Sequence, residues 1–222
     1  MKRLINLTLI MLLVSISNTF GQEKQRGFTV FGSVPFISND FKKFDFQDPW
    51  IGIGVDYDKP INEYGVILTT SAALLARNID PEEVLYSWFD DQPHFERTYH
   101  SNFYNLYLLS GLKEQGKIST MFKGYSSIQA GIRIFFPPGF TDTLPDSYFA
   151  SVRKGSFNSA VAFGFGLGGG LVFQNKYNLG FRLYLFPTVK AKGRLKYDNL
   201  ADNRIHYSPE PLTLSFRFGI QL

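Results

Sequence analysis

The sequence predicts an all-β fold, an eight-stranded antiparallel up-and-down β-barrel of the transmembrane type. Three observations lead to this prediction. Apolar and polar residues alternate along several extended segments, long and short connections between these segments also alternate, and no internal apolar run reaches the length of a membrane-spanning helix. The clearest alternation runs over Leu212–Leu222, where every second residue is apolar and the chain ends on the strand itself.

The first 21 residues predict a secretory signal peptide that is removed from the mature chain. Lys2 and Arg3 precede a mostly apolar stretch over Leu4–Ile16, and Gly21 offers a small residue near the expected cleavage position. This stretch of about thirteen residues is shorter than the roughly twenty that a membrane-spanning helix needs. We therefore expect residues 22–222 to form a single outer-membrane β-barrel domain.

Composition narrows the function classes. The chain contains no cysteine, so an exported protein of this sequence must be stabilised by packing and backbone pairing without disulfides. Its formal net charge is +4, with two of the positive charges in the signal segment, which gives no support for nucleic-acid binding. Aromatic residues make up 17% of the chain, which suits β-strands and aromatic belts at a membrane interface.

Eight segments are expected to form the strands, with connections that alternate in length. The strands are Gly27–Ile37, Trp50–Asp58, Tyr64–Arg77, Asn102–Lys113, Ile118–Phe136, Phe157–Gln174, Asn178–Tyr197 and Pro211–Leu222. The short connections are Lys59–Glu63, Glu114–Lys117 and Asn175–Tyr177, and the long ones are Ser38–Pro49, Asn78–Ser101, Pro137–Ser156 and Asp198–Glu210. Outer-membrane barrels place short turns on the periplasmic side and long loops outside, so this sorting favours that class.

The first four strands differ in how cleanly they alternate. On the second strand, large apolar residues such as Ile51 and Ile53 occupy one face, and Gly52, Gly54 and Asp56 occupy the other. The first, third and fourth strands alternate less cleanly. Their large residues Phe31, Tyr107 and Leu109 are expected to point inward and fill part of the lumen.

The last four strands alternate more clearly. On the sixth strand, Val161, Phe163 and Phe165 oppose a face made of Gly and Ala, which would be a poor surface against water but suits the crowded inside of a small barrel. We expect the seventh strand to carry Arg182, Lys190, Lys192 and Arg194 inward. That strand is too long for an apolar band about 25 Å tall, so the fifth to seventh strands are expected to project above the membrane as a docking wall.

The inward faces predict a polar cluster in the lumen. Its members are Asp56, Arg133, Arg182, Tyr184 and Arg217. Unpaired charges inside a narrow barrel cost several kcal/mol each, so partners must be present. We favour a polar plug of ion pairs and tyrosines over an anion-attracting lumen, because eight strands enclose little space. Near the outer end of the seventh strand, Lys190, Lys192 and Arg194 could also contact the phosphates of surface glycolipid.

The long connection Asn78–Ser101 combines acidic and aromatic side chains. Candidate recognition residues within it are Tyr86, Trp88, Asp90, Asp91 and His94. They could bind a partner protein, and no spacing among them is diagnostic of a metal site. An enzymatic alternative would use His94 or His100 on lipid, but no nucleophile and base are fixed in a recognisable arrangement, so we expect no catalytic, cofactor or metal site.

Taken together, the signal ending Thr19-Phe20-Gly21-Gln22, the glycine-rich sixth strand and the terminal strand Leu212–Leu222 carry a resemblance. The chain resembles the small outer-membrane β-barrel proteins of the Bacteroidota porin-like families, including the PorT-like group labelled outer membrane protein beta-barrel domain. The resemblance implies eight strands, no cofactor and a place in the outer membrane of a Gram-negative bacterium. It also implies contact with outer-membrane lipids and with the barrel-assembly machinery.

The leading functional hypothesis is an outer-membrane barrel with a structural, adhesive or accessory role, whose extracellular loops perform recognition. Three alternatives stay open at this point. They are a narrow anion-preferring pore, a periplasmic ligand-binding barrel of lipocalin type and an outer-membrane lipid-modifying enzyme.

Overall fold

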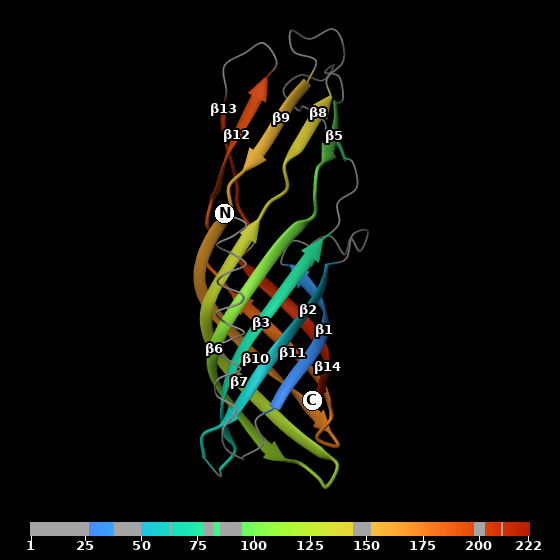
Figure 1. Ribbon diagram of the computed structural model, residues 1–222, viewed down its shortest axis with the longest axis vertical. Coiled ribbons are helices and arrows are strands. Elements are labelled where there is room, and N and C mark those ends of the chain that lie inside the picture. Colours follow the sequence, from blue (N-terminus) through green and yellow to red (C-terminus); the bar gives the residue numbers. More distant parts are fainter. Residues whose placement is uncertain are drawn as a thin grey trace.

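The computed structural model describes residues 27–37, 50–62, 64–77, 82–84, 95–143, 152–197, 203–209 and 211–222. The signal peptide expected at residues 1–21 lies outside this described part. Two sheets make up the fold, a closed eight-stranded antiparallel barrel and a six-stranded sheet above it (Figure 1). The eight-stranded antiparallel barrel predicted from the sequence is confirmed. Within the described residues, no helix has the length and apolar character to cross a bilayer.

The barrel ring is formed by strands that are each paired on both sides. In ring order they are β1 (Gly27–Ile37), β14 (Leu212–Gln221), β11 (Tyr177–Leu185), β10 (Ala160–Phe173), β7 (Phe122–Phe136), β6 (Phe103–Lys117), β3 (Val66–Arg77) and β2 (Ile51–Pro60). The ring closes because β1 pairs with β14 on one side and with β2 on the other, with Thr29 opposite both Gln221 and Asp56.

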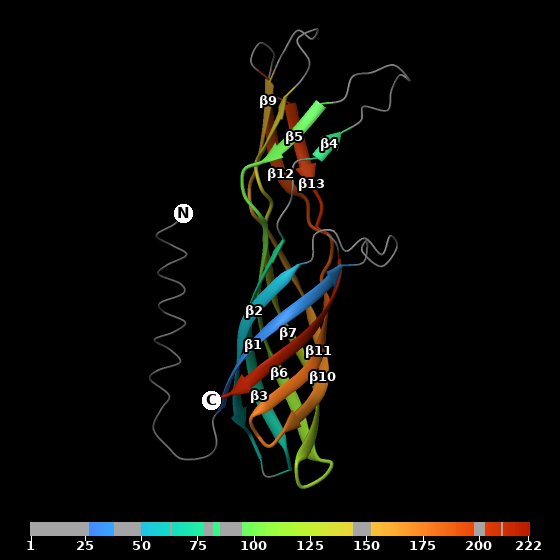
Figure 2. The same ribbon diagram turned by 90° about the vertical axis from the view of Figure 1, so that its right-hand side faces the viewer.

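The second sheet, which we name the outer sheet, lies beyond the barrel, where the fifth to seventh strands were expected to project, but a separate six-stranded sheet was not predicted. Its order is β13 (Asn203–Tyr207), β12 (Ala191–Tyr197), β9 (Val152–Phe157), β8 (Phe140–Thr143), β5 (Phe95–Tyr99) and β4 (Glu82–Val84). These strands lie in the connections from β3 to β6, from β7 to β10 and from β11 to β14, and Figure 2 shows them beyond one end of the barrel. The short connections lie at the opposite end, which we name the turn end. The expected sorting of connections by length is therefore present.

Local hydrogen bonds and backbone conformation explain the three short turns. In the first, Asn62 Oδ1 accepts from the backbone N–H groups of Tyr64 and Val66, both at 3.1 Å. In the third, Gln174 and Asn175 adopt φ values of 50° and 54°, as the two central residues of a type I′ hairpin require. The Lys176 N–H donates to the Phe173 carbonyl across this turn at 3.0 Å.

The second turn lies further along the chain than the sequence prediction placed it. The sequence placed a short connection over Glu114–Lys117, but β6 continues to Lys117 and the chain reverses over residues 118–121. Ser119 makes this reversal, because its Oγ accepts from the N–H groups of Met121 and Phe122 at 3.3 and 3.2 Å. The predicted turn at Glu114–Lys117 was wrong.

The barrel wall turns its large apolar side chains outward. Phe163 is 76% exposed and Ile53 is 67% exposed, although neither lies in a loop. Other outward apolar residues are Val30, Val34, Ile51, Ile128, Val161, Phe165, Leu179, Phe181, Phe216, Phe218 and Ile220. Phe31, Tyr107 and Leu109 are buried inside, as expected. The glycines of β10 make room for inward side chains; a Cβ on Gly166 would lie 3.0 Å from Leu109.

The expected seventh strand is two strands with opposite face parity. It divides into β11 and β12 because residues 186–190 are not paired in either sheet, and Pro187 has no N–H for a ladder. Even-numbered residues such as Arg182 and Tyr184 are buried in β11, whereas the buried residues of β12 are Ala191 and Leu195. Lys190, Lys192 and Arg194 are therefore exposed, and their predicted inward orientation was wrong.

Aromatic packing joins the interior of the barrel to the inner face of the outer sheet. Phe103 stacks on Phe135 with ring centroids 5.9 Å apart and meets Tyr207 at 5.1 Å. Tyr207 in turn contacts Phe157, whose ring lies 6.0 Å from that of Phe140. The inner face of the outer sheet thus continues the barrel interior. Its other face continues the outer wall of the barrel.

Candidate functional site

A buried ion-pair group occupies the barrel lumen. Asp56 enters from β2, Arg182 from β11 and Arg217 from β14, and each side chain lies on the inward face of its strand. Arg217 Nη2 donates to Asp56 Oδ2 at 2.8 Å, and Arg182 Nη1 lies 3.5 Å from Asp56 Oδ1. The Arg217 guanidinium also lies 3.3 Å from the centroid of the Phe31 ring. One carboxylate thus holds two guanidinium groups in the lumen.

The other two members of the predicted polar cluster lie in an aromatic layer closer to the outer sheet. Tyr184 stacks on Tyr107 with ring centroids 4.1 Å apart, and Tyr107 meets Phe186 edge-on at 5.4 Å. The Arg133 guanidinium lies 5.5 Å from the centroid of the Phe186 ring. All four side chains are buried. The structure therefore divides the predicted cluster into an ion-pair group and an aromatic layer.

A second buried ion pair lies nearer the turn end. Lys113 Nζ donates to Asp58 Oδ2 at 2.6 Å and lies 4.7 Å from the centroid of the Tyr125 ring. Tyr125 donates its hydroxyl hydrogen to Asn178 Oδ1 at 2.9 Å. The sequence prediction did not include Asp58 or Lys113. Asp58 follows Asp56 by two residues on β2 and therefore faces the same side of the strand, which is the sequence signal for this ion pair.

The charge balance of the described lumen is positive. Buried cations inside the barrel are Lys113, Arg133, Arg182 and Arg217, whereas the buried carboxylates there are Asp56 and Asp58. All six residues lie on barrel strands, namely β2, β6, β7, β11 and β14. Ion pairs and aromatic rings therefore occupy the lumen at several levels.

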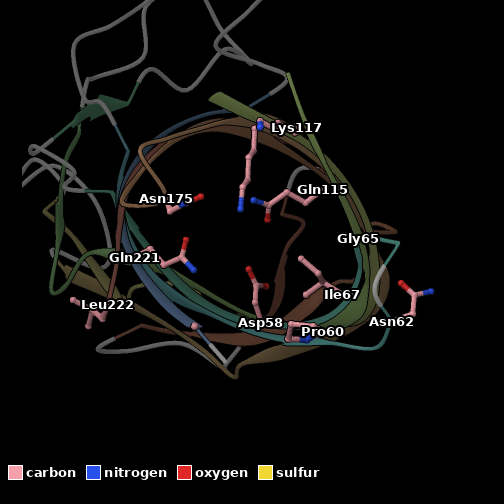
Figure 3. A pocket seen from close by; sticks show the side chains of 12 residues that line it. Asp58, Pro60, Asn62, Gly65, Ile67, Gln115, Lys117, Asn175, Gln221 and Leu222 are labelled. Carbon is pink, nitrogen blue, oxygen red and sulfur yellow. The ribbon is translucent and has the colours of Figure 1, made fainter. Parts of the chain in front are cut away.

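A polar cavity opens at the turn end, below the Asp58–Lys113 pair. Its volume is about 500 Å³. Figure 3 shows Lys117, Gln115 and Gln221 extending into the opening, with Asp58 at its edge. The full lining is Gly27, Asp58, Pro60, Asn62, Gly65, Ile67, Gln115, Lys117, Lys123, Asn175, Gln221 and Leu222. The lining is mixed and mostly polar, which differs from the apolar pocket that a lipocalin-type ligand site would need.

The outer sheet has its own buried charge centre. Asp142 of β8 is fully buried and accepts from Arg97 Nε at 2.7 Å and from Arg153 Nε at 2.6 Å. Burial opposes the charge on Arg97, but the hydrogen bond and the charge of Asp142 outweigh it and raise the pKa of this guanidinium above its ordinary value. Because Arg97 and Arg153 come from the two strands beside β8, Asp142 ties three strands together.

The predicted loop recognition residues are not part of the described structure. Tyr86, Trp88, Asp90, Asp91 and His94 all lie outside the described residues. His100 lies within them, and its Nε2 is 2.7 Å from Thr141 Oγ1 in an exposed hydrogen bond. Among the described residues, no three His, Cys, Asp or Glu side chains gather as metal ligands would.

Comparison with known proteins gives structural similarity without sequence similarity. No protein-family model matches the chain, and no curated protein matches it. The fold is similar to that of a major outer membrane protein from Thermus thermophilus, with 11% identity, a TM-score of 0.53, and coverage of 89% of this chain and 99% of that one. At this identity, the similarity supports the fold alone.

Two further solved structures align over most of their length but with lower scores. The outer membrane protein OprG from Pseudomonas aeruginosa is 9% identical, with a TM-score of 0.46 and coverage of 90% of this chain and 97% of that one. Ail, the attachment invasion locus protein of Yersinia pestis, is 11% identical, with a TM-score of 0.33 and coverage of 89% and 96% respectively.

Proposed function

We propose that this chain is an integral outer-membrane protein of a Gram-negative bacterium, with a closed barrel as its anchor and the outer sheet as its recognition surface. The observation that carries the proposal is the inverted wall. The large apolar side chains of Phe163 and Ile53 are exposed on the outside of the wall. The charged side chains of Arg182, Arg217 and Asp56 are buried in the lumen. A water-soluble barrel would have the reverse arrangement, and lipid-exposed barrels have this one.

The same proposal places the mature chain in the outer membrane after removal of residues 1–21, in contact with lipid and with the barrel-assembly machinery. The glycine-rich β10 and the alternating β14 support membership of the Bacteroidota porin-like group, including its PorT-like members. The similar fold of the outer membrane protein from Thermus thermophilus is consistent with this location.

Cysteine labelling tests the location and orientation directly, because the native chain has no cysteine. Ser156→Cys lies on the exposed face of the outer sheet, and Tyr64→Cys lies in an exposed short turn. On intact cells, a membrane-impermeant maleimide should label the first variant and should label the second only after lysis. Recovery of the protein in a detergent-free soluble fraction would contradict the proposal and would favour a periplasmic binding barrel.

The side chains that occupy the lumen support a structural, adhesive or accessory role rather than transport. Two buried ion pairs and the Tyr107–Tyr184 stack occupy the barrel interior at successive levels. In planar bilayers, the purified protein should therefore show no steady single-channel conductance. A steady conductance with anion preference would instead support a narrow pore, the alternative that the excess of lumen cations favours.

A further inference from the structure

One exposed face of the outer sheet carries basic side chains from three adjacent strands. Cα pairing places Lys192 opposite His206 and Arg194 opposite Arg204 between β12 and β13. It also places Arg194 opposite Ser156 and Lys196 opposite Lys154 between β12 and β9. Directly paired residues share one face of an antiparallel sheet. We name this set the basic face: Lys154, Lys192, Arg194, Lys196, Arg204 and His206, all of which are exposed.

We propose that the basic face binds the phosphate groups of glycolipid in the outer leaflet of the outer membrane. This proposal rests on the proposed function, because it requires the outer sheet to stand at the outer surface of that membrane. It goes further by naming the chemistry of the partner and the residues that contact it.

The pairing of like charges is the first argument. Arg194 stands directly opposite Arg204, and Lys196 stands directly opposite Lys154. Like charges at opposed positions destabilise a sheet, so an ordinary solvated surface would gain from replacing one of each pair. An anion placed between the two cations converts this repulsion into attraction.

The second argument is the lack of acidic side chains on the three strands themselves, within the part of the chain that the structure describes. The segments of β9, β12 and β13 contain no Asp or Glu within their bounds. The nearest buried acid of the described sheet is Asp142, and it serves Arg97 and Arg153 on the opposite face. The hydroxyl of Ser156 lies among the cations, where it can donate a further hydrogen bond to an anionic oxygen.

The height of the basic face above the apolar belt indicates that lipid phosphate groups are its ligand. The Asn158 N–H donates to the Lys192 carbonyl at 2.9 Å, so Lys192 lies at the level of Asn158, three residues beyond the outward apolar Val161. At about 3.3 Å per residue, the lowest cation stands roughly 10 Å above the end of the apolar belt. The headgroup layer begins where the hydrocarbon ends. Because the basic face continues the outer wall, its cations face sideways toward neighbouring lipids.

The sequence also predicted a contact with glycolipid phosphates, but it grouped the basic residues differently. The sequence singled out Lys190, Lys192 and Arg194 on one continuous strand and assigned them to the inward face. The break at residues 186–190 instead turns Lys192 and Arg194 outward, and strand pairing adds Lys154, Lys196, Arg204 and His206 from other parts of the chain.

The test measures lipopolysaccharide binding by the full-length protein in detergent micelles. One variant carries Arg194→Gln and Arg204→Gln, and a second carries Lys154→Gln and Lys196→Gln. The matched control carries Lys59→Gln and Lys176→Gln, which remove the same charge near the turn end. We expect each basic-face variant to bind about tenfold or more weakly, and the control to bind as the wild type does. Raising the salt concentration should weaken wild-type binding.

Three companion measurements separate the possible outcomes. Lipopolysaccharide stripped of phosphate by hydrofluoric acid should bind weakly to the wild type. The Arg194→Gln/Arg204→Gln variant should unfold at the same or a higher urea concentration, since it removes a repulsive pair; a purely structural role would lower that concentration. Heat-modifiable migration in gels, which reports the folded barrel, should be unchanged in every variant.

The inference is overturned if the basic-face variants bind lipopolysaccharide as the wild type does, or if removal of phosphate has no effect. Binding of heparin in place of lipopolysaccharide would overturn it in favour of a soluble sulfated glycan. Failure of the proposed function gives a different result, because the protein would then be soluble without detergent and the cysteine labels would not sort by side.

Discussion

Asp56 is the residue on which the lumen ion-pair group depends most. It accepts from Arg217 at 2.8 Å and lies 3.5 Å from Arg182, while each arginine is at least nine-tenths buried. A buried ion pair gives little net stability, but removing one partner leaves uncompensated charge in a low-dielectric interior. The asymmetry makes the carboxylate the most sensitive position in the barrel, since two cations lose their counter-charge together.

The first prediction is that Asp56→Asn destabilises the barrel by about 3–5 kcal/mol. The amide keeps the shape of the side chain and removes its charge, so the loss reports the ion-pair group alone. Urea unfolding of the protein in lipid vesicles, followed by tryptophan fluorescence, measures the change. Glu114→Gln is the control because Glu114 is exposed. Equal unfolding midpoints for Asp56→Asn and the wild type would contradict this assignment.

A second prediction concerns the thin wall at β10. A Cβ on Gly166 would lie 3.0 Å from Leu109 and 3.6 Å from Arg182, so a Gly166→Leu side chain must displace one of them. Overpacking of this kind costs about 1–3 kcal/mol. Leu109→Ala in the same chain should recover part of the loss by making room. Additive losses in the double variant would show that the two side chains do not compete for space.

At the scale of elements, the outer sheet depends on the charge centre at Asp142. The carboxylate is buried on β8 and holds Arg97 of β5 and Arg153 of β9. These three strands are short, with four to six residues each, and such strands have few ladder hydrogen bonds. A specific ion-pair centre therefore contributes more to the order of this sheet than it would in the barrel.

The third prediction is that Asp142→Asn loosens the outer sheet and leaves the barrel folded. Amide hydrogen exchange should become faster in residues 95–99, 140–143 and 152–157, while amides of β10 and β11 keep their protection. Thr143→Val is the control, because Thr143 is exposed on the same strand. Loss of protection throughout the barrel would show that the two sheets unfold as one unit.

Alternation along each strand let the sequence predict the barrel wall. Facing assignments on β2, β7, β10 and β14 held because each is set by a period of two inside one continuous strand. The inward orientation predicted for Lys192 and Arg194 was wrong because the strand is interrupted at the unpaired residues around Pro187. The prediction also missed the outer sheet as a separate sheet, because β4, β5, β8 and β13 are short strands within segments predicted as loops and β12 was assigned to the seventh barrel strand. Pairing across the ring, such as Asp56 with Arg217, depends on barrel closure, which a linear pattern does not encode.

For the whole molecule, the decisive property is the contrast between the two sides of the wall. Outward positions such as Phe165 and Phe181 are apolar and half exposed, and inward positions such as Gln129 and Arg182 are polar and buried. In water this arrangement would be unfavourable on both sides. In a bilayer the outward face lies against hydrocarbon and the backbone is satisfied by the closed ring.

The fourth prediction follows from that contrast. Phe165→Arg near the middle of β10 should destabilise the protein in lipid vesicles by about 2–4 kcal/mol, because it places a charge against hydrocarbon. Thr98→Arg on the outer sheet should have little effect, since Thr98 is exposed above the apolar belt and stands opposite the uncharged Thr141. Urea titration of both variants in vesicles provides the comparison. An unaffected Phe165→Arg variant would mean that water surrounds the barrel.

The β1–β14 seam has a kinetic consequence. Its partners, such as Val30 and Ile220, are the most distant in sequence of any paired barrel strands, so the seam carries the largest loop-closure entropy. We expect it to form last during assembly. Until it does, the intermediate presents two unpaired strand edges that can recruit another copy of the chain. Pairing of β1 with β14, rather than insertion of the individual hairpins, would then be the slowest step of assembly. Its rate would also set how long the open intermediate can misassemble.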